Sequence, residues 1–386
     1  MPAQPGTDLT AFSLVFPGQP AADERTYSEA VLRQTDLPGV QLVPPPYEPD
    51  VAMAQVIARG DIPDFPHDFA GDSVRRAMAA RGIRVALTGS GGDTGLTGSH
   101  FHYADLLRRG RFIRFLRRYR DVIRQPAMSW RSADLLPCAV WPLLPRGARR
   151  HLRPLARRIA GHGVPGWIAP GLARRSGLTQ EHPLREIQAG QFARADTRDG
   201  FENAWTHMAL DMYQRGSTGH AIEDRHPFFD RRVIEFAIAL PDEQRWQRGT
   251  TRYILRRAMT GRLPSLVQNR PDDGKGDFSH VYLAPLQALG GERFFSDTLA
   301  IAGQDWIVAA EVRALYRRMQ SQLAAADPGY GDSAFRLWTI AAVEMWYSGV
   351  FGQGAGGESW KTRNAGRRAV LPTTRPASDV RITVPS

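Results

Sequence analysis

The chain has 386 residues, carries a net charge of +11 and contains a single cysteine, Cys138. This length allows a large core and predicts two domains, and one cysteine excludes an internal disulfide and a cysteine-rich zinc site. Because the sequence has neither an apolar run of about 18 residues nor a basic-then-apolar leader, we expect a soluble, cytoplasmic protein without a membrane partner.

The positive charge raises the question of a nucleic-acid partner, because excess cations attract polyanions. Nearly all of these cations are arginine, however, and lysine occurs only at positions 275 and 361. Such one-sided usage indicates compositional bias, and many of the arginines fall on the predicted solvent faces of helices. We therefore expect no nucleic-acid partner. Lys275 stands out because its compact ammonium lies in a glycine- and aspartate-rich stretch.

The N-terminal part of the chain alternates predicted strands and helices. The predicted strands are 10–16, 40–43 and 83–88, and the predicted helices are 23–33, 50–59 and 67–81. Ile83, Val85 and Leu87 indicate a strand buried on both faces. This order predicts a doubly wound parallel sheet, in which ligands bind at the carboxyl ends of the strands. Since only three strands are visible, we expect part of the sheet to be missing upstream.

From about residue 100 to residue 350 the pattern is helical. The predicted helices are 108–124, 199–215, 231–240, 250–260, 308–324 and 333–351, and 137–170 is a Pro-, Gly- and Arg-rich connection with one short helix. The basic amphipathic helix 108–124 has a composition found at membrane surfaces, but we expect its apolar side to pack on the core. We predict an α/β domain over 9–110, a helical domain over 111–351 and a disordered tail over 352–386.

The stretch 87–99 (LTGSGGDTGLTGS) is the first candidate site. Gly89, Gly91 and Gly92 allow a ligand to approach the backbone, and Asp93 is the only charged residue in the loop. A carboxylate among small residues at the carboxyl end of a parallel strand suits a hydrated Mg²⁺ that carries nucleotide phosphates. A plain strand-to-helix turn, with Asp93 or Thr94 as the helix cap, explains the same residues equally well.

A second cluster lies in 221–240, where acids and arginines surround two phenylalanines. This pattern indicates buried salt bridges that position a loop, with Arg225 paired to Glu223 or Asp230. The alternative is a helix start that Asp230 caps, with an aromatic anchor beside it. His226 has no second histidine at ligand spacing, so we discount it as a metal ligand.

A third candidate is the segment 269–278 (NRPDDGKGDF), which contains Lys275. A glycine-flanked lysine can reach a phosphate site as a point charge and stabilise charge that develops during acyl transfer. The alternative is a surface turn. Ser-His-Asp hydrolysis is not favoured, because the sequence has no G-x-S-x-G elbow.

Three segments together resemble the synthetase domain of the asparagine synthetase family, which includes β-lactam synthetases and lasso-peptide cyclases. The first is 10–31 (TAFSLVFPGQPAADERTYSEAV), and the second is the glycine-rich loop, similar to the family's G-E-G-x-D-E-L-x-G-G. The third, 207–278, is similar to a succession of E-x-R-x-P-F-L-D, G-x-x-K-x-x-L-R and R-x-x-K-x-x-F. The resemblance spans about residues 9 to 350 and is most specific in this third segment.

The resemblance implies a PP-loop-type α/β fold that uses ATP and Mg²⁺ to adenylate a carboxylate, which ammonia or an amine then attacks. It assigns Mg²⁺ binding to Asp93 and stabilisation of the transition states to Lys275. It also implies main-chain contacts of Leu14 and Val15 with adenine, nucleotide contacts of Gly89, Ser90, Gly91 and Gly92, and a mainly architectural role for Glu223, Arg225 and Asp230.

The sequence departs from the family pattern in three ways. It has no S-G-G-x-D-S phosphate loop before residue 10, it has no glutaminase domain, and Ser90 and Thr94 replace the usual acids of the loop. We therefore expect a fragment, a mis-started gene product or a degenerate homologue, with little turnover unless a separate subunit supplies the missing loop or ammonia. The loss of the acid at position 90 weakens the case for aspartate and leaves other small-molecule or peptide carboxylates open. The alternatives are a lasso-peptide-type cyclase and a non-catalytic binding subunit.

Overall fold

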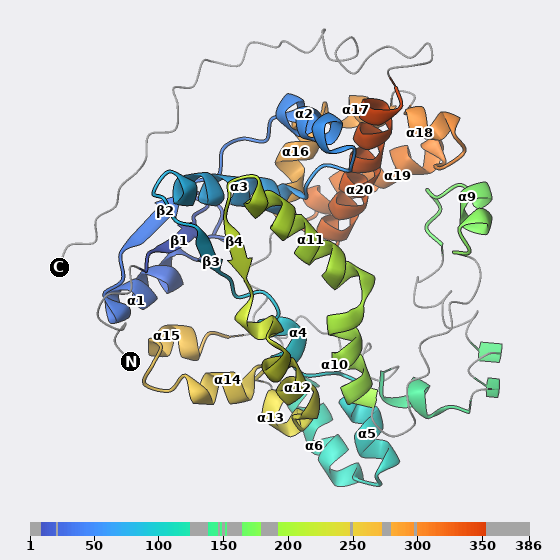
Figure 1. Cartoon of the computed structure of the whole chain (residues 1–386). Helices are drawn as coiled ribbons and strands as arrows, with labels where there is room; N and C mark the ends of the chain where they lie inside the picture. The colour runs from blue at the N-terminus through green and yellow to red at the C-terminus, as the bar shows by residue number, and fades with distance from the viewer. Residues whose placement is uncertain are drawn as a thin grey trace.

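The computed structural model describes most of the chain, and Figure 1 shows short strands side by side with helices around them. The described residues are 9–20, 22–123, 138–145, 147–148, 151–152, 164–178, 192–247, 250–271, 279–296 and 299–352. The segment 353–386, which includes nearly all of the predicted tail, lies outside them. The predicted α/β fold is confirmed.

Within the described residues the strands form two separate parallel pairs. β1 (Ala11–Leu14) pairs with β2 (Gly39–Leu42), and β3 (Val85–Leu87) pairs with β4 (Glu223–Arg225). The strands follow one another in the order β2, β1, β3, β4 across Figure 1. The sequence did not predict β4, because its three residues are all charged and carry no strand signal.

β3 is less buried than the sequence predicted. The side chains of Val85 and Leu87 remain 40% and 64% exposed, so the prediction of a strand buried on both faces is wrong. A parallel strand becomes buried when strands pair with both of its edges and helices cover both of its faces. In the described part of the chain, β3 pairs with β4 alone, and its other edge borders a cavity.

The helices that accompany the strands begin and end with ordinary local signals. They are α1 (Arg25–Thr35), α2 (Pro49–Arg59), α3 (Pro66–Ala79), α4 (Gly92–Leu96), α5 (His102–Arg108) and α6 (Phe112–Ile123). Pro49 and Pro66 occupy first helical positions, where the missing N–H group costs nothing. Gly60 ends α2 in the left-handed conformation, with φ of 68°.

The rest of the described chain is helical except for β4. Its elements are η1 (Trp141–Leu143), α9 (Pro170–Arg175), α10 (Phe192–Glu202), α11 (Ala204–Thr218), η2 (Pro227–Phe229), α12 (Arg231–Ala239), α13 (Asp242–Arg245), α14 (Tyr253–Ala258), α15 (Ser265–Gln268), η3 (Ser279–Tyr282), α16 (Leu283–Ala288), α17 (Glu292–Ser296), α18 (Ala300–Gly303), α19 (Ala309–Ala324) and α20 (Tyr330–Val350). The predicted helix 199–215 is two helices. Asn203 separates them, because its side chain accepts the Thr206 N–H and so caps α11.

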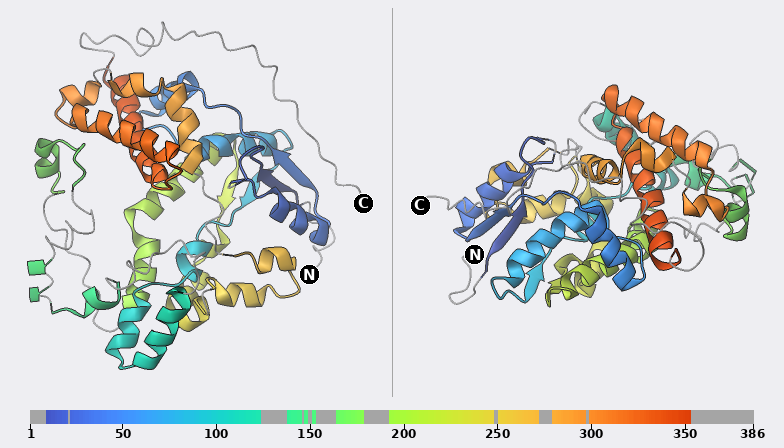
Figure 2. Two further views of the ribbon diagram at one scale, coloured as in Figure 1. Left: turned by 180° about the vertical axis from the view of Figure 1, so that it is seen from behind. Right: turned by 90° about the horizontal axis from the view of Figure 1, so that it is seen from above.

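The largest core surrounds α20, whose Leu337, Trp338 and Met345 are completely buried. Met53 and Val56 of α2 belong to the same core, and Figure 2 shows α2 lying against the C-terminal helices in both views. An N-terminal helix therefore shares its core with the end of the described chain. The domain bounds 9–110 and 111–351 stay a prediction.

The amphipathic helix α6 is only partly covered. Phe115 and Tyr119 stack with centroids 5.8 Å apart and pack beside Tyr103, as predicted. Phe112 and Leu116 are 59% and 61% exposed, so this part of the apolar side does not pack on the core. Among the described residues, no helix combines the length and the apolar character that a membrane span requires.

Candidate functional site

The glycine-rich loop follows β3 directly and packs against η2. Gly91 has a φ of +93°, and a Cβ on it would lie 2.7 Å from Cε2 of Phe229. A Cβ on Gly92 would lie 3.3 Å from the ring of Phe228. These two glycines are therefore required by the backbone and by close aromatic packing. Gly89 differs, because no atom lies within 4 Å of a Cβ placed on it, so its Cα faces open space.

Hydrogen bonds fix the loop to the end of β4. The Thr88 N–H donates to the carbonyl of Arg225 at 3.0 Å, and the Thr88 hydroxyl lies 2.6 Å from Nδ1 of His226. The Ser90 N–H donates to the same hydroxyl at 3.3 Å, and the Gly92 N–H donates to the carbonyl of Gly89 at 3.3 Å. His226 thus contacts the loop as a positioning residue. The nucleotide contacts expected of the loop residues stay a prediction.

Asp93 lies in the first turn of α4 with its side chain 79% exposed. Its Oδ1 is 2.8 Å from Nε of Arg252, which immediately precedes α14. Arg252 has a φ of +52°, a conformation that costs a non-glycine residue free energy and often marks a functional site. We did not single out Arg252 from the sequence. The signal was present, because Arg252 stands where the family's G-x-x-K-x-x-L-R pattern has its lysine.

The segment that leads to Lys275 is anchored at the start of α1. An NH2 group of Arg270 lies 2.6 Å from Oε1 of Glu24, and its guanidinium lies 4.5 Å from the ring centroid of Tyr27. Arg256 donates to the carbonyls of Gln268 and Arg270 at 2.9 and 2.7 Å. Lys275 itself lies outside the described residues, so its position opposite Asp93 stays a prediction.

The residues expected beside adenine lie at the end of β1. Leu14 is half-buried, and Val15 is buried. The Val15 N–H donates to the carbonyl of Leu42 at 2.9 Å, so this donor is used within the β1–β2 pair. The adenine contact of both residues stays a prediction.

The cluster in 221–240 is a capped helix start with an aromatic anchor. Arg225 does pair with Glu223 at 2.9 Å, but the two side chains are 58% and 59% exposed, so the predicted buried salt bridge is wrong. Asp230 accepts the Arg232 N–H at the start of α12. Hydrogen bonds from the side chain and backbone of Arg232 lower the pKa of Asp230 to about 2. The ion pairs Arg225–Glu223 and Arg232–Asp230 lie in solvent rather than in a core, because a charged group loses less hydration free energy there.

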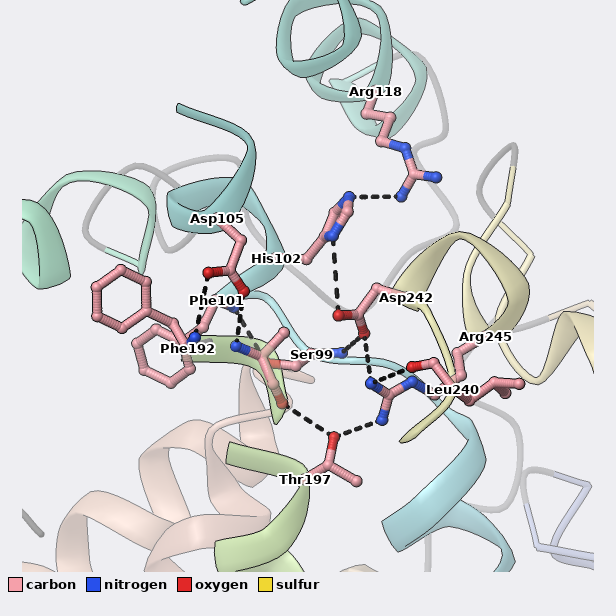
Figure 3. Close-up of polar contacts among 11 residues, drawn as sticks. Ser99, Phe101, His102, Asp105, Arg118, Phe192, Thr197, Leu240, Asp242 and Arg245 are labelled. Atoms are coloured by element: carbon pink, nitrogen blue, oxygen red, sulfur yellow. Dashed lines mark hydrogen bonds and ion pairs between the residues drawn. The ribbon is translucent and has the colours of Figure 1, made fainter. Parts of the chain in front are cut away.

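A buried polar cluster holds the segment after the loop, and Figure 3 shows its contacts. Asp242 accepts the Ser99 N–H at 3.4 Å and lies 3.2 Å from an NH2 group of Arg245, which is 1% exposed. Nδ1 of His102 is 3.8 Å from Asp242. Burial raises the pKa of Asp242 to about 6 and lowers the pKa of His102 to about 4. The cluster therefore ties the end of the loop region to α13.

A second contact in Figure 3 joins α5 to α10. The two carboxylate oxygens of Asp105 accept the N–H groups of Phe192 and Ala193 at 3.2 and 3.0 Å. These N–H groups belong to the first turn of α10, which has no internal acceptor for them. The sequence did not indicate this contact, because the partners lie far apart along the chain.

The side chains at the loop that can ligate a metal suit Mg²⁺ carried by a nucleotide. Among the described residues, no group of three or more His, Cys, Asp or Glu side chains converges as a metal cage. The loop offers one exposed carboxylate, that of Asp93. Mg²⁺ in nucleotide sites keeps several waters and phosphate oxygens and needs only one or two protein carboxylates. The residues present therefore fit a nucleotide-borne Mg²⁺.

The fold and the site define an α/β protein with a glycine-rich loop after a parallel strand and an Asp–Arg pair beside that loop. A family model described as asparagine synthase matches residues 1–348. The chain therefore belongs to the asparagine synthase family, and the resemblance seen in the sequence is confirmed.

Curated relatives carry names from the same family. Proteins of Mycobacterium bovis and Mycobacterium tuberculosis named "Putative asparagine synthetase (glutamine-hydrolyzing)" are 24% identical over 266 residues, which is 59% of this chain and 36% of each relative. Asparagine synthetase (glutamine-hydrolyzing) 1 of Bacillus subtilis is 43% identical over 51 residues, 13% of this chain and 8% of that protein. The matched regions thus span little more than a third of these relatives' length at most.

Proposed function

We propose that this chain is the synthetase part of an ATP-dependent amide ligase with a PP-loop-type fold. Such a carbon–nitrogen ligase adenylates a carboxylate and transfers the acyl group to ammonia or an amine. Family membership supports the proposal. The observation that carries it is the exposed carboxylate of Asp93, which lies on a glycine-rich loop after β3 and pairs with Arg252.

The chain's own residues divide the work in the proposed site. Bound ATP with Mg²⁺ would supply the adenylyl group that activates the carboxylate. Asp93 would hold the Mg²⁺, and Arg252, whose Nε lies 2.8 Å from Oδ1 of Asp93, would offer a cation for phosphate oxygens. The open space at Gly89 admits a ligand close to the backbone. Lys275 would stabilise the charge that develops on the reacting phosphate and acyl oxygens.

The carboxylate substrate is proposed only by class. Ser90 replaces an acid of the family's loop, which weakens the case for free aspartate and for asparagine as product. Other small carboxylates and the carboxylate of a peptide side chain, as in lasso-peptide cyclisation, fit the proposal equally well. Free aspartate, free glutamate and an acidic peptide therefore form the substrate panel.

Two measurements on the full chain test the proposal. Binding of MgATP should weaken at least about tenfold in Asp93→Asn, a loss of about 1.4 kcal/mol. ATP–pyrophosphate exchange with the substrate panel should fall at least about 100-fold in Lys275→Ala, while MgATP binding changes far less. Glu235→Gln is the matched control, because Glu235 is also an exposed acid, paired with Arg231 at 2.7 Å. Unchanged binding and exchange in both site variants would refute the assignment.

A non-catalytic binding subunit is the second candidate. Within the described residues the β1–β2 and β3–β4 pairs do not join into one sheet, and this favours the second candidate, because ligands of this fold class bind at the carboxyl ends of the strands of one open sheet. A partner subunit that supplies a second phosphate loop or ammonia would restore catalysis. MgATP binding without pyrophosphate exchange, for every carboxylate and with such a partner present, would favour the non-catalytic role.

A further inference from the structure

One side of helix α6 packs on the molecule. Phe115 and Tyr119, four residues apart, stack with each other, and Phe115 meets Tyr103 of α5 edge to face with ring centroids 5.7 Å apart. Nη1 of Arg118 lies 2.9 Å from Nε2 of the buried His102, also in α5. Because a helix turns once in 3.6 residues, these contacts all fall on one side of α6, and the opposite side points away from α5.

The opposite side of α6 exposes three large apolar side chains. Ile113 is 68% exposed, and Phe112 and Leu116 are exposed to a similar degree. Residues three and four apart are neighbours on a helix surface, so Leu116 adjoins both of the others. We call these three side chains the α6 patch. Scattered exposed apolar residues are ordinary, whereas a contiguous patch among polar residues is typical of an interaction surface.

Arginines border the α6 patch. Arg117 follows Ile113 by four residues and Arg120 follows Leu116 by four, so both adjoin the patch, and both are exposed. The sequence of α6 contains one acid, Asp121, against four arginines. The arginine-rich composition of the whole chain accounts for the cations but not for the apolar side chains exposed among them. The α6 patch therefore combines apolar surface with positive charge.

This combination matches an anionic lipid surface. The apolar side chains of a surface-lying helix enter the acyl region, while long arginine side chains reach the phosphates of the headgroups. α5 and α6 lie together at one end of the molecule in Figure 1 and in the left view of Figure 2, where a flat surface can approach them. A second copy of this chain fits less well, because the arginines of the two patches would face each other in a symmetric contact.

We propose that the α6 patch binds anionic phospholipid bilayers reversibly, with the helix lying in the plane of the surface. The expectation of no membrane partner rested on the lack of a spanning segment, which a surface-lying helix does not need. The expected packing on the core holds for Phe115 and Tyr119 but not for the patch on the other side. The proposal concerns where the chain acts, so it stands or fails independently of the proposed ligase activity.

Vesicle co-sedimentation of the full chain tests the proposal. The probes are vesicles of phosphatidylcholine alone and vesicles that also contain about 30% phosphatidylserine. Binding should be at least about tenfold tighter to the anionic vesicles, because each arginine near their surface adds attraction. Added salt should weaken this binding, because it screens exposed charges. Equal binding to both kinds of vesicle, or binding to neither, would overturn the proposal.

Matched apolar variants test whether the α6 patch makes the contact. Ile113→Ser should weaken binding to the anionic vesicles about tenfold, because the variant places no isoleucine side chain in the acyl region. Ile57→Ser is the control, because Ile57 is 48% exposed on α2, at the other end of the molecule in Figure 1. An equal loss in both variants, or no loss in Ile113→Ser, would overturn the proposal.

Matched charge variants separate the patch from the net charge of the chain. Arg117→Gln combined with Arg120→Gln should weaken binding to the anionic vesicles about tenfold. Arg313→Gln combined with Arg317→Gln removes the same charge from exposed positions of α19 and should have little effect. An equal loss in the two double variants would mean that net charge alone attracts the chain, and the proposal would be wrong.

A fluorophore on the patch gives a readout that does not depend on affinity. Attached at Ile113→Cys in a Cys138→Ser background, an environment-sensitive dye should shift to shorter wavelength when anionic vesicles are added. The same dye at Ile57→Cys should not shift. An unchanged spectrum at position 113 would overturn the proposal, because the patch would then stay in water.

Two other occupants of the α6 patch have distinct outcomes. The probe for an acidic protein is a synthetic helical peptide of leucine and glutamate, and tighter binding of this peptide than of the anionic vesicles would assign the patch to such a partner. A dimer of the full chain that Ile113→Ser dissociates would assign it to a second copy. Either result would overturn the membrane proposal.

Discussion

Replacing Gly91 by alanine should distort the loop and destabilise the fold. Gly91 has a φ of +93°, and such a left-handed conformation costs a residue with a Cβ about 1–2 kcal/mol. The new Cβ would also lie 2.7 and 2.8 Å from two ring carbons of Phe229, and overpacking of this kind costs about 1–3 kcal/mol. Together these costs predict a loss of about 2–5 kcal/mol in the free energy of unfolding.

Urea unfolding of the full chain measures this loss, and two other glycines separate its causes. Gly82 has a φ of +72° but no atom near a built Cβ, so Gly82→Ala should show the backbone cost alone. Gly89 has open space and no positive φ, so Gly89→Ala should leave stability nearly unchanged. Phe229→Leu should relieve part of the cost of Gly91→Ala when the two are combined. If Gly91→Ala is as stable as Gly89→Ala, the loop does not pack on Phe229.

Three further predictions concern two buried carboxyl groups and one exposed apolar side chain. Burial raises the pKa of Asp242 from 3.8 to about 6, so the ionisation of this carboxyl destabilises the fold as pH rises from about 4 to 6. An asparagine at this position would not ionise, so the free energy of unfolding of Asp242→Asn, compared with that of the parent, should be more favourable at pH 7 than at pH 4 by roughly 1–3 kcal/mol. Urea unfolding at the two pH values measures this difference. The two carboxylate oxygens of Glu344 accept the N–H groups of Ala300 and Ile301 at 3.0 and 3.1 Å. Because a glutamine amide has one acceptor oxygen, Glu344→Gln should lower the free energy of unfolding by about 1–3 kcal/mol and lower Tm. Leu116→Ser should stay within about 0.5 kcal/mol of the parent in urea unfolding, because this side chain is 61% exposed. A stability difference between Asp242→Asn and the parent that does not change with pH would contradict the first prediction. An unchanged Tm of Glu344→Gln would contradict the second, and a loss of stability well above about 0.5 kcal/mol in Leu116→Ser would contradict the third.

The sequence alone determined features that depend on neighbouring residues. The strand at 10–16 and the helices that became α19 and α20 follow from local composition and periodicity, which act within a few residues. The turn after β3 also follows from local composition, because glycines permit backbone conformations that other residues avoid. The resemblance of three segments to family motifs indicated the family, which the match over 1–348 confirmed.

Only the tertiary structure decided which distant groups meet. Arg252 pairs with Asp93, and Arg270 with Glu24, across separations that no local pattern records. β4 exists because Glu223 and its neighbours lie beside β3, although their composition disfavours a strand. The exposure of Leu87 likewise depends on which strand pairs with β3 and not on its apolar side chain. Hydrogen bonds and ion pairs form between groups that the whole fold brings together, so sequence patterns over a few residues cannot specify them.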